Sequence, residues 1–355
     1  MNNRVLLTVS GTIDANLASS VEQGLRPRAD YVELASVLRA DLLDNADAAR
    51  TAGRFGRIIH SVAGNDALLA WTCFRRRKRY DAIVTDGEQV GLPYALLCRV
   101  VWRRSSPKHC MIVHVMSVPK KMLLFKTCGL RRRIDMMFVY SSWQKDFALA
   151  KLGMRSDQVV LTSFMVDTRF FRPHAVVPAK RCMIASAGLE FRDYETLVNA
   201  VRGLDVEVVI AAASPWSKRS TKVISSPLPA NVTVCRLGFV DLRQLYADSL
   251  FVVMPLHDVK FQAGVTTILE AMAMERAVIC SRSVGQTDVI INEETGLYVP
   301  PGDVAALRQA IERLLRFEDL AMRLGQRARM WASEHAEIAV YADHIASSVR
   351  AMMPN

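Results

Sequence analysis

The chain has 355 residues, of which 51% are hydrophobic and 23% are charged. This composition is typical of a folded globular protein and excludes a disordered or low-complexity chain. The length allows two domains with a core each. We see neither a secretory signal nor an apolar stretch of the roughly 18 residues that span a bilayer, so we expect a cytoplasmic protein. The seven cysteines are scattered without C-x-x-C spacing, which argues against a disulfide framework or a zinc site.

The net positive charge of the chain comes entirely from its first half. Residues 1–170 hold 26 Lys and Arg against 15 Asp and Glu, whereas residues 171–355 hold 20 of each. Such an excess of cations forms either a solvated face or a surface for an anionic partner. Its aromatic and apolar neighbours favour an anionic membrane surface, or an acceptor that is lipid-linked or anionic. Nucleic acid is unlikely, because no nucleic-acid-binding module is visible. The two densest runs supply the candidate acceptor or membrane side: Arg75, Arg76, Arg77, Arg131, Arg132 and Arg133.

Short apolar runs alternate with helical patterns along the first half. Buried strands are predicted at 5–9, 82–85, 111–114 and 137–140, with helices at 16–24 and 143–152. Strands that alternate with helices indicate βαβ units and a parallel sheet.

A second series of the same kind follows. It predicts strands at 183–186, 207–212, 232–237, 250–255, 277–281 and 296–299, and helices at 194–201, 242–248, 267–274, 304–316 and 338–352. The fold class is therefore α/β, with two Rossmann-like domains facing a cleft and their ligands at the carboxyl ends of the strands. We expect residues 1–165 to form an N-terminal domain, 166–179 a linker and 180–335 a C-terminal domain. Residues 336–355 are expected to form a C-terminal helix that packs back on the first domain.

The segment 261–303 contains the clearest candidate site. Gly264 stands between a buried strand and a helix, where free N–H groups and the helix dipole favour a diphosphate. Glycine has no Cβ, so the backbone can approach the phosphate closely. Glu270 lies further inside that helix, where its carboxylate can accept two ribose hydroxyls. A glycine before a helix is by itself also found in plain strand–loop–helix units.

The whole segment resembles the C-terminal half of the retaining GT-B glycosyltransferases of family 4, also called glycosyl transferases group 1. The resemblance covers about residues 160–320 and the first half only in outline. It is carried by Glu270-Ala271-Met272-Ala273, Asp288-Val289-Ile290, Thr295-Gly296-Leu297-Tyr298-Val299-Pro300-Pro301-Gly302-Asp303 and the turn Ser186-Ala187-Gly188-Leu189.

The resemblance implies a glycosyltransferase that moves a sugar from a nucleotide-sugar donor to an acceptor hydroxyl, with retention and without a cofactor or a metal. It also implies that residues 1–165 bind the acceptor and residues 180–335 bind the nucleotide sugar. It implies that Glu270 binds the ribose and that Arg192 pairs with phosphate oxygens. The remaining implied donor contacts are the backbone amides of Gly264, Val265, Thr266 and Thr267, and a base-binding loop at Gly238 and Val240.

Two positions depart from the family pattern. Gln262 stands eight residues before Glu270, where the family has a carboxylate that contacts the donor sugar; glutamine keeps hydrogen bonding but loses the charge. This change motivates one alternative, a non-catalytic nucleotide-sugar-binding or scaffold protein of the same fold. A GT-B nucleotide-sugar epimerase is a second alternative. Glu275-Arg276 replaces the usual glycine after the helix, which predicts a small stability cost.

The first domain offers fewer candidates. His114 ends a predicted strand and resembles the histidine that the family places near the donor sugar, so it joins Arg192 and Gln262 as a catalytic candidate. A lone histidine at a strand end is often structural. Asp86 and Glu88 follow the strand at 82–85, where they form either a polar part of the cleft or an ordinary capping cluster.

Overall fold

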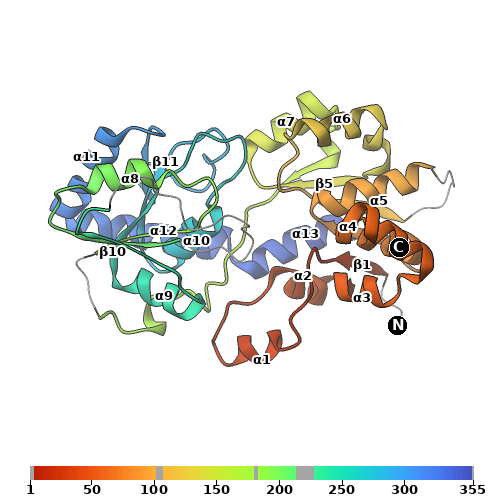
Figure 1. Ribbon diagram of the computed structural model, residues 1–355, viewed down its shortest axis with the longest axis horizontal. Helices are drawn as coiled ribbons and strands as arrows, with labels where there is room; N and C mark the ends of the chain where they lie inside the picture. The colour runs from red at the N-terminus through yellow and green to blue at the C-terminus, as the bar shows by residue number, and fades with distance from the viewer. Residues whose placement is uncertain (1–3, 101–106, 180–182, 213–227, 354–355) are drawn as a thin grey trace. The chain divides into compact units, whose positions relative to one another are not determined.

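The computed structural model describes residues 4–100, 107–179, 183–212 and 228–353 (Figure 1). The chain forms two compact units. The first contains residues 1–19, 29–162 and 341–355, and the second contains residues 20–28 and 163–340. The short segment 20–28 thus leaves the first unit and returns to it, which the sequence did not predict. In the described part of the chain, no helix combines the length and the apolar character needed to cross a membrane.

The first unit is built on a six-stranded parallel sheet in the order β2-β1-β3-β4-β5-β6. Its strands are β1 (Val5–Thr8), β2 (Asp41–Leu43), β3 (Ala82–Asp86), β4 (Lys108–Ile112), β5 (Met136–Val139) and β6 (Val159–Leu161). Its helices are α1 (Leu17–Glu22, which continues into the second unit), α2 (Asp30–Leu38), α3 (Asn45–Arg50), α4 (Gly53–Arg76), α5 (Glu88–Val100), α6 (Pro119–Thr127) and α7 (Ser142–Leu152). Three 3₁₀ turns complete it: η1 (Arg77–Arg79), η2 (Leu130–Arg133) and η3 (Ser156–Gln158).

The four inner strands of this sheet are buried except at Asp86, the last residue of β3, and Lys108, the first residue of β4. All four residues of β1 and of β5 are buried, which explains their continuous apolar sequence, because helices cover a parallel sheet on both faces. The edge strands β2 and β6 have only three residues each and were not predicted. The helix α4 is interrupted at Gly64, whose φ of 80° lies in the left-handed region that glycine adopts without strain.

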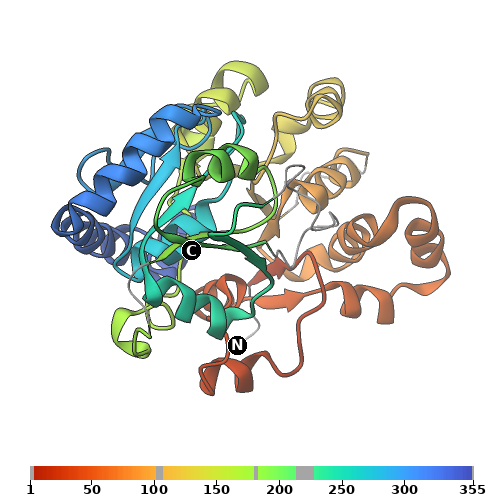
Figure 2. The ribbon, with the colours of Figure 1, turned by 60° about the vertical axis from the view of Figure 1, so that its left-hand side comes forward.

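The second unit has an equivalent six-stranded parallel sheet in the order β12-β11-β10-β7-β8-β9, seen from a second direction in Figure 2. Its strands are β7 (Met183–Ala187), β8 (Glu207–Ala211), β9 (Val232–Cys235), β10 (Ser249–Met254), β11 (Ala277–Ser281) and β12 (Gly296–Val299). The other elements are η4 (Pro173–Ala175), α8 (Tyr194–Val201), α9 (Phe239–Asp248), α10 (Val265–Ala273), α11 (Val304–Arg316) and α12 (Glu318–His335). One apolar cluster joins the sheet to α9, α10 and α12, and another joins it to α8 and α11.

The last helix, α13 (Ile338–Met352), begins in the second unit and belongs to the first from Tyr341 onward. The hydroxyl groups of Tyr341 and Tyr140 lie 3.1 Å apart in a buried hydrogen bond. Arg350 also donates to the carbonyl of Val37 on α2. The prediction that the C-terminal helix packs on the first domain is therefore confirmed.

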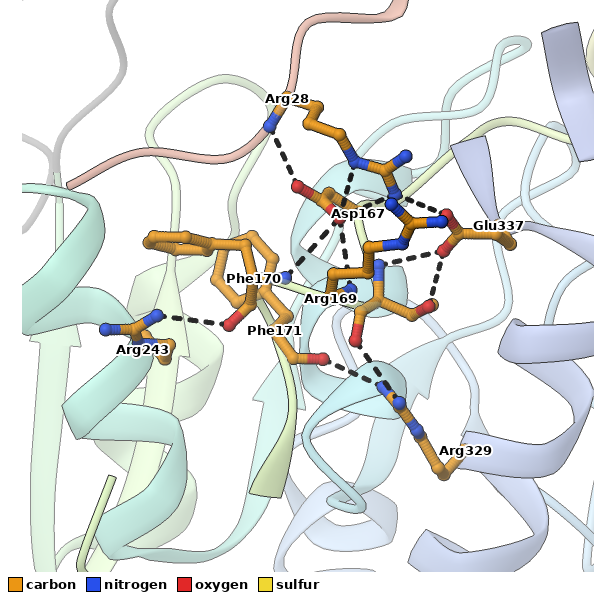
Figure 3. Close-up of polar contacts among 9 residues, drawn as sticks. Arg28, Asp167, Arg169, Phe170, Phe171, Arg243, Arg329 and Glu337 are labelled. Carbon is orange, nitrogen blue, oxygen red and sulfur yellow. Dashed lines mark hydrogen bonds and ion pairs between the residues drawn. The ribbon is translucent and has the colours of Figure 1, made fainter. Parts of the chain in front are cut away.

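A partly buried ion cluster lies beside the places where the chain passes between the units (Figure 3). Arg28 donates from its backbone N–H and from its guanidinium to Asp167, at 2.8 Å in each case, and to Glu337 at 2.5 Å. Glu337 also accepts from the backbone N–H of Thr168 at 3.0 Å. Burial opposes ionisation of Asp167, but the hydrogen bonds from Arg28 hold its pKa below the usual value. The cluster thus ties together three segments that are far apart in the sequence.

Candidate functional site

The loops after β7 and β10 converge at the carboxyl edge of the second sheet. These two strands are neighbours at the point where the strand order reverses, which is where open α/β sheets bind ligands. The loops are joined by a bridge between Arg192 and Leu256 and by a hydrogen bond from the Asp193 N–H to the Pro255 carbonyl, at 3.0 Å. This pairing brings Arg192 to the start of α10.

Gly264 is the residue on which this arrangement depends. It precedes α10 with a φ of 75°, and α10 begins at Val265. A Cβ at this position would lie 2.9 Å from the Met254 sulfur and 3.3 Å from Nη1 of Arg192. The absence of a side chain therefore lets the guanidinium approach the first turn of α10. The N–H groups of that turn, at Val265, Thr266 and Thr267, lack carbonyl partners within the helix and are available to an anion.

Arg192 is a buried cation without an ion pair among the described residues. Its side chain donates to two backbone carbonyls, those of Ala187 at 3.0 Å and Glu190 at 2.8 Å, and the residue is only 8% exposed. Gly188 leaves the room it needs, since a Cβ there would lie 2.3 Å from Nη2. Burial lowers the pKa of Arg192, and the nearby groups that raise it, Glu190 among them, do not offset the lost hydration. A buried guanidinium of this kind suits an anionic ligand.

Glu270 faces the buried side of α10. One of its oxygens accepts a hydrogen bond from the Tyr246 hydroxyl on α9, at 2.9 Å. Burial raises the pKa of Glu270 to about 7, although Tyr246 and the charge of Arg192 act in the opposite direction. Tyr246 was missed by sequence reasoning, because it lies within an apolar helical pattern that is typical of a core residue. Its hydroxyl fixes the orientation of the carboxylate.

Gln262 lies in the loop between β10 and α10 and is 8% exposed. Its Oε1 is buried and has no hydrogen-bond partner among the described residues. The same is true of the hydroxyl of Ser283 and of both amide atoms of Gln286, in the loop after β11. The two loops are in contact, since the Gly285 N–H donates to the Val259 carbonyl at 2.9 Å. Ser283 and Gln286 were also missed, because nothing in the sequence marks a polar side chain as unpartnered.

Gly238 and Val240 do not form the loop that was predicted. Gly238 directly precedes α9, and Val240 is in the first turn of that helix. The helix begins three residues earlier than the apolar spacing indicated, because residues of a first turn are partly exposed and interrupt the pattern. A contact to the nucleotide at these positions would therefore come from a helix N-terminus.

In the first unit, the carboxyl edge of the sheet carries a histidine–carboxylate pair. β4 ends at Ile112, so His114 lies in the following turn and not at the strand end that was predicted. Its Nε2 lies 3.3 Å from Oδ1 of Asp86, which ends β3. Burial opposes protonation of His114, but Asp86, together with Glu88 and Asp30, raises its pKa overall. Burial and the Asp86 charge also raise the pKa of Asp30 to about 6; Asp30 was missed by sequence reasoning.

Glu88 has a different role from Asp86. Its buried carboxylate accepts from the N–H groups of His114, at 2.9 Å, and Val115, at 3.2 Å, and from the Lys121 ammonium at 2.5 Å. The Gln144 amide donates to the His114 carbonyl at 2.6 Å. The backbone of His114 is thus held on both sides while its ring contacts Asp86. Glu88 is a positioning residue for this turn.

The two arginine runs lie at the opposite edge of the same sheet. Residues 75–79 end α4 and form η1, just before β3, and residues 131–133 form η2, just before β5. Both runs therefore precede parallel strands, whereas Asp86 and His114 follow them. Part of each run has a structural role: Arg75 donates to the Thr51 carbonyl at 3.3 Å, and Arg77 lies 3.7 Å from the ring centre of Phe74. The structure does not bring these cations together with His114.

Three comparisons with known proteins agree with this geometry. Residues 190–316 match the family model described as Glycosyl transferases group 1. The predicted resemblance is confirmed. Among curated proteins, the putative glycosyltransferase EpsD of Bacillus subtilis (strain 168) is 30% identical over 135 residues, which are 36% of this chain and 33% of EpsD. The capsular polysaccharide biosynthesis glycosyltransferase CapM of Staphylococcus aureus is 38% identical over 61 residues, 17% of this chain and 16% of CapM. The chain is thus matched to a third or less of the length of these relatives.

Solved structures are similar over almost the whole chain. Sucrose-phosphate synthase from Thermosynechococcus elongatus superposes with a TM-score of 0.71 at 17% identity, covering 98% of each chain. Anabaena HepE in complex with UDP-glucose gives a TM-score of 0.70 at 14% identity, covering 98% of this chain and 99% of HepE. The fold is GT-B. At these identities the likeness concerns the fold, and the chemistry has to be argued from the site.

Proposed function

We propose that this protein is a glycosyltransferase that moves a sugar from a nucleotide-sugar donor to an acceptor hydroxyl, with retention at the anomeric carbon. The observation that supports the proposal best is the position of Arg192, a buried cation without a carboxylate partner in the described structure, against the N-terminus of α10. The guanidinium of Arg192 and the positive end of the α10 dipole lie close together, and both attract the diphosphate of a nucleotide sugar. HepE, which shares this fold, binds UDP-glucose.

Each residue of the site has a place in the proposed reaction. The bond between the anomeric carbon and the diphosphate breaks, a bond from that carbon to the acceptor oxygen forms, and the proton of the acceptor hydroxyl passes to an oxygen of the departing diphosphate. Arg192 and the α10 amides stabilise the charge that grows on the leaving diphosphate. Glu270 accepts the ribose hydroxyls, and Gln262 contacts the sugar. His114, held by Asp86 and Glu88, lies at the carboxyl edge of the first sheet, where we propose that the acceptor binds.

The reaction is proposed to need no metal ion. The described residues contain no group of three or more His, Cys, Asp or Glu placed to hold a metal. We expect turnover to be unchanged when EDTA is added, and loss of activity that Mg²⁺ or Mn²⁺ restores would contradict this part of the proposal.

A thermal-shift screen of nucleotide sugars tests the donor site directly. A ligand present at 100 times its dissociation constant adds about 2.7 kcal/mol to the free energy of unfolding, which is easily seen as a rise in Tm. We expect one nucleotide diphosphate and its sugar to stabilise the protein, and the sugar to be transferred to an acceptor. Stabilisation without transfer across a broad acceptor panel would support the scaffold alternative, and conversion of the donor to an epimer would support the epimerase.

We also propose that the first unit binds an anionic membrane surface. Three large apolar side chains, Phe55, Ile58 and Val62, are 59%, 59% and 82% exposed along the first half of α4, beside Arg54 and Arg57. Apolar side chains at helical spacing next to cations are typical of a helix at a lipid interface. Binding to vesicles should require anionic lipid, should weaken as salt rises, and should weaken further in a variant with Phe55 and Ile58 changed to Ser. Equal binding to neutral vesicles would contradict the proposal.

A further inference from the structure

A basic hollow of about 650 Å³ opens in the first unit at the amino ends of β4, β5 and β6. The strands are parallel, so this edge of the sheet is opposite to the one that carries Asp86 and His114. The hollow is therefore separate from the part of the proposed transferase site that belongs to the same unit. Its charged lining consists of Lys108, Arg131, Arg132, Arg155, Asp135 and Asp157.

The two carboxylates hold two of the four cations in place. Lys108 lies 3.1 Å from Asp135, whose second oxygen accepts from the His109 N–H at 2.9 Å. Arg155 donates twice to Asp157, at 2.9 and 2.7 Å. Neither cation uses all its donors, because an ammonium has three and a guanidinium five. Lys108 and Arg155 are thus oriented by their partners and can still donate to a ligand.

Arg131 and Arg132 supply two further positive charges that have no carboxylate partner in the described part of the chain. Arg131 donates from Nη1 to the carbonyl of Gly153, the residue that ends α7, at 3.2 Å. A Cβ at Gly153 would also lie 3.2 Å from this nitrogen, so the glycine leaves room for the guanidinium. The hydrogen bond to Gly153 gives a structural role to one N–H group of Arg131. The remaining N–H groups of Arg131 and the charge of Arg132 have no such structural role in the described part of the chain.

We propose that this hollow binds a ligand with a phosphate monoester group, with the phosphate between Arg131 and Arg132 and further contacts from Lys108 and Arg155. A phosphate monoester carries a charge of about −1.5 to −2 at neutral pH, which the two surplus arginines balance. A guanidinium group can donate two parallel hydrogen bonds to the oxygens of one phosphate. A volume of about 650 Å³ lies within the range of roughly 300–1,000 Å³ for small-molecule sites, so the ligand carries an organic group beside the phosphate. The phosphate comes either from a lipid headgroup or from a soluble phosphorylated metabolite.

Calorimetric titration of the full chain with glycerol 3-phosphate at low salt tests the site, with glycerol as the uncharged control. We expect binding that R131Q/R132Q weakens by at least about tenfold, because both surplus charges are lost. The matched control is K78Q/R79Q, which removes the same charge from exposed positions outside the hollow and should keep the wild-type affinity. Absence of binding by the wild type, or equal loss in both variants, overturns the proposal.

A variant with the opposite expected effect complements this test. Asp157→Asn removes a carboxylate from the rim and releases Arg155, so glycerol 3-phosphate should bind more tightly than to the wild type. Weaker binding contradicts the assignment. If R131Q/R132Q does not fold, Arg132→Gln replaces it, since Arg132 is exposed.

Vesicles distinguish the two sources of the phosphate. A lipid ligand predicts that vesicles with phosphatidic acid bind more protein than vesicles of equal charge with phosphatidylserine, and that R131Q/R132Q abolishes the difference. A soluble ligand predicts no preference between the two lipids while the calorimetric binding of glycerol 3-phosphate persists.

Discussion

The carboxyl edges of the two sheets are built in the same way but differ in the charged side chains that are buried there. Each edge belongs to a six-stranded parallel sheet. In the second unit the dominant charged group is Arg192, which no carboxylate of the described residues neutralises. In the first unit, Asp30, Asp86 and Glu88 surround His114. The same architecture thus places a buried cation without an ion pair in one unit and a group of carboxylates around a histidine in the other.

This difference teaches that the side chains of the loops, and not the sheets, decide what each edge can bind. It also refines the expectation of an anionic acceptor. The cations that suggested it lie at the amino edge of the first sheet, so an anionic part of an acceptor would be attracted there and repelled by the carboxylates around His114. The group that reacts at the carboxyl edge is better described as a neutral hydroxyl.

The largest expected effect follows the loss of the unpaired cation. Arg192→Ala should lower kcat by about 10²–10³-fold and donor affinity by less, because the negative charge on the leaving diphosphate grows in the transition state. Steady-state kinetics measure both. Arg329→Ala is the matched control, since Arg329 donates to the carbonyls of Phe171, Ala273 and Thr168 and should affect stability rather than turnover. An equal loss of kcat and affinity in Arg192→Ala would make Arg192 a simple anchoring residue.

Glu270→Ala should weaken nucleotide binding by about 1.5–3 kcal/mol, the range for hydrogen bonds to a charged group, and leave the fold intact. The pKa of about 7 also predicts that wild-type affinity falls as pH drops below 7, because the protonated carboxyl loses an acceptor. Glu270→Gln should lack this dependence. Calorimetry from pH 6 to pH 8 measures both effects, and an unchanged affinity in Glu270→Ala would contradict the ribose assignment.

The same pKa makes a prediction for the ligand-free protein. The folded state holds a proton on Glu270 up to about pH 7, whereas the unfolded chain releases it near its ordinary pKa of 4.5. Between these values the folded state binds more protons, so this group's contribution to stability falls as pH rises. The Tm of the wild type should therefore drop more than that of Glu270→Gln between pH 5 and pH 8.

A smaller effect is expected at Gln262. Gln262→Ala should lower turnover by about tenfold, the effect of one hydrogen bond of roughly 1.4 kcal/mol, whereas Gln262→Glu should keep transfer and shift the preference among donor sugars. The buried and unpartnered Oε1 motivates this expectation, because a donor sugar would supply the missing hydrogen bond. Full activity of Gln262→Ala with every donor would show that the side chain does not contact the sugar.

The smallest effect concerns the first unit. Asp86→Asn should lower the pKa of His114, since the carboxylate at 3.3 Å is the main group that favours the imidazolium. NMR titration of the histidine ring protons reports this pKa directly. Lys121→Met serves as the control: it removes a cation that contacts Glu88 rather than the ring, so it should not lower the pKa of His114. A His114 pKa that Asp86→Asn leaves unchanged would contradict the pair.

The two parallel sheets and most of the segment 261–303 could be predicted from the sequence alone. Apolar strands of four to six residues between helical patterns were recognisable because both faces of such strands are buried, as in β1, β5 and β10. The helices α8, α11 and α13 begin and end where their pattern predicted. The position of Gly264 before α10 was also readable, because a strand–glycine–helix order is local in the sequence.

The contacts between side chains of different elements could be seen only in the tertiary structure. Tyr246 reaches Glu270 and Asp86 reaches His114 across 24 and 28 residues of sequence, and no local pattern records such contacts. The arginine runs and His114 lie at opposite edges of the first sheet because the runs precede parallel strands and His114 follows one. The composition of the chain does not show this. The missing ion pair of Arg192 is likewise visible only when every neighbour is in place. Periodicity reports burial, which is a local property of an element, whereas a site depends on distances between elements.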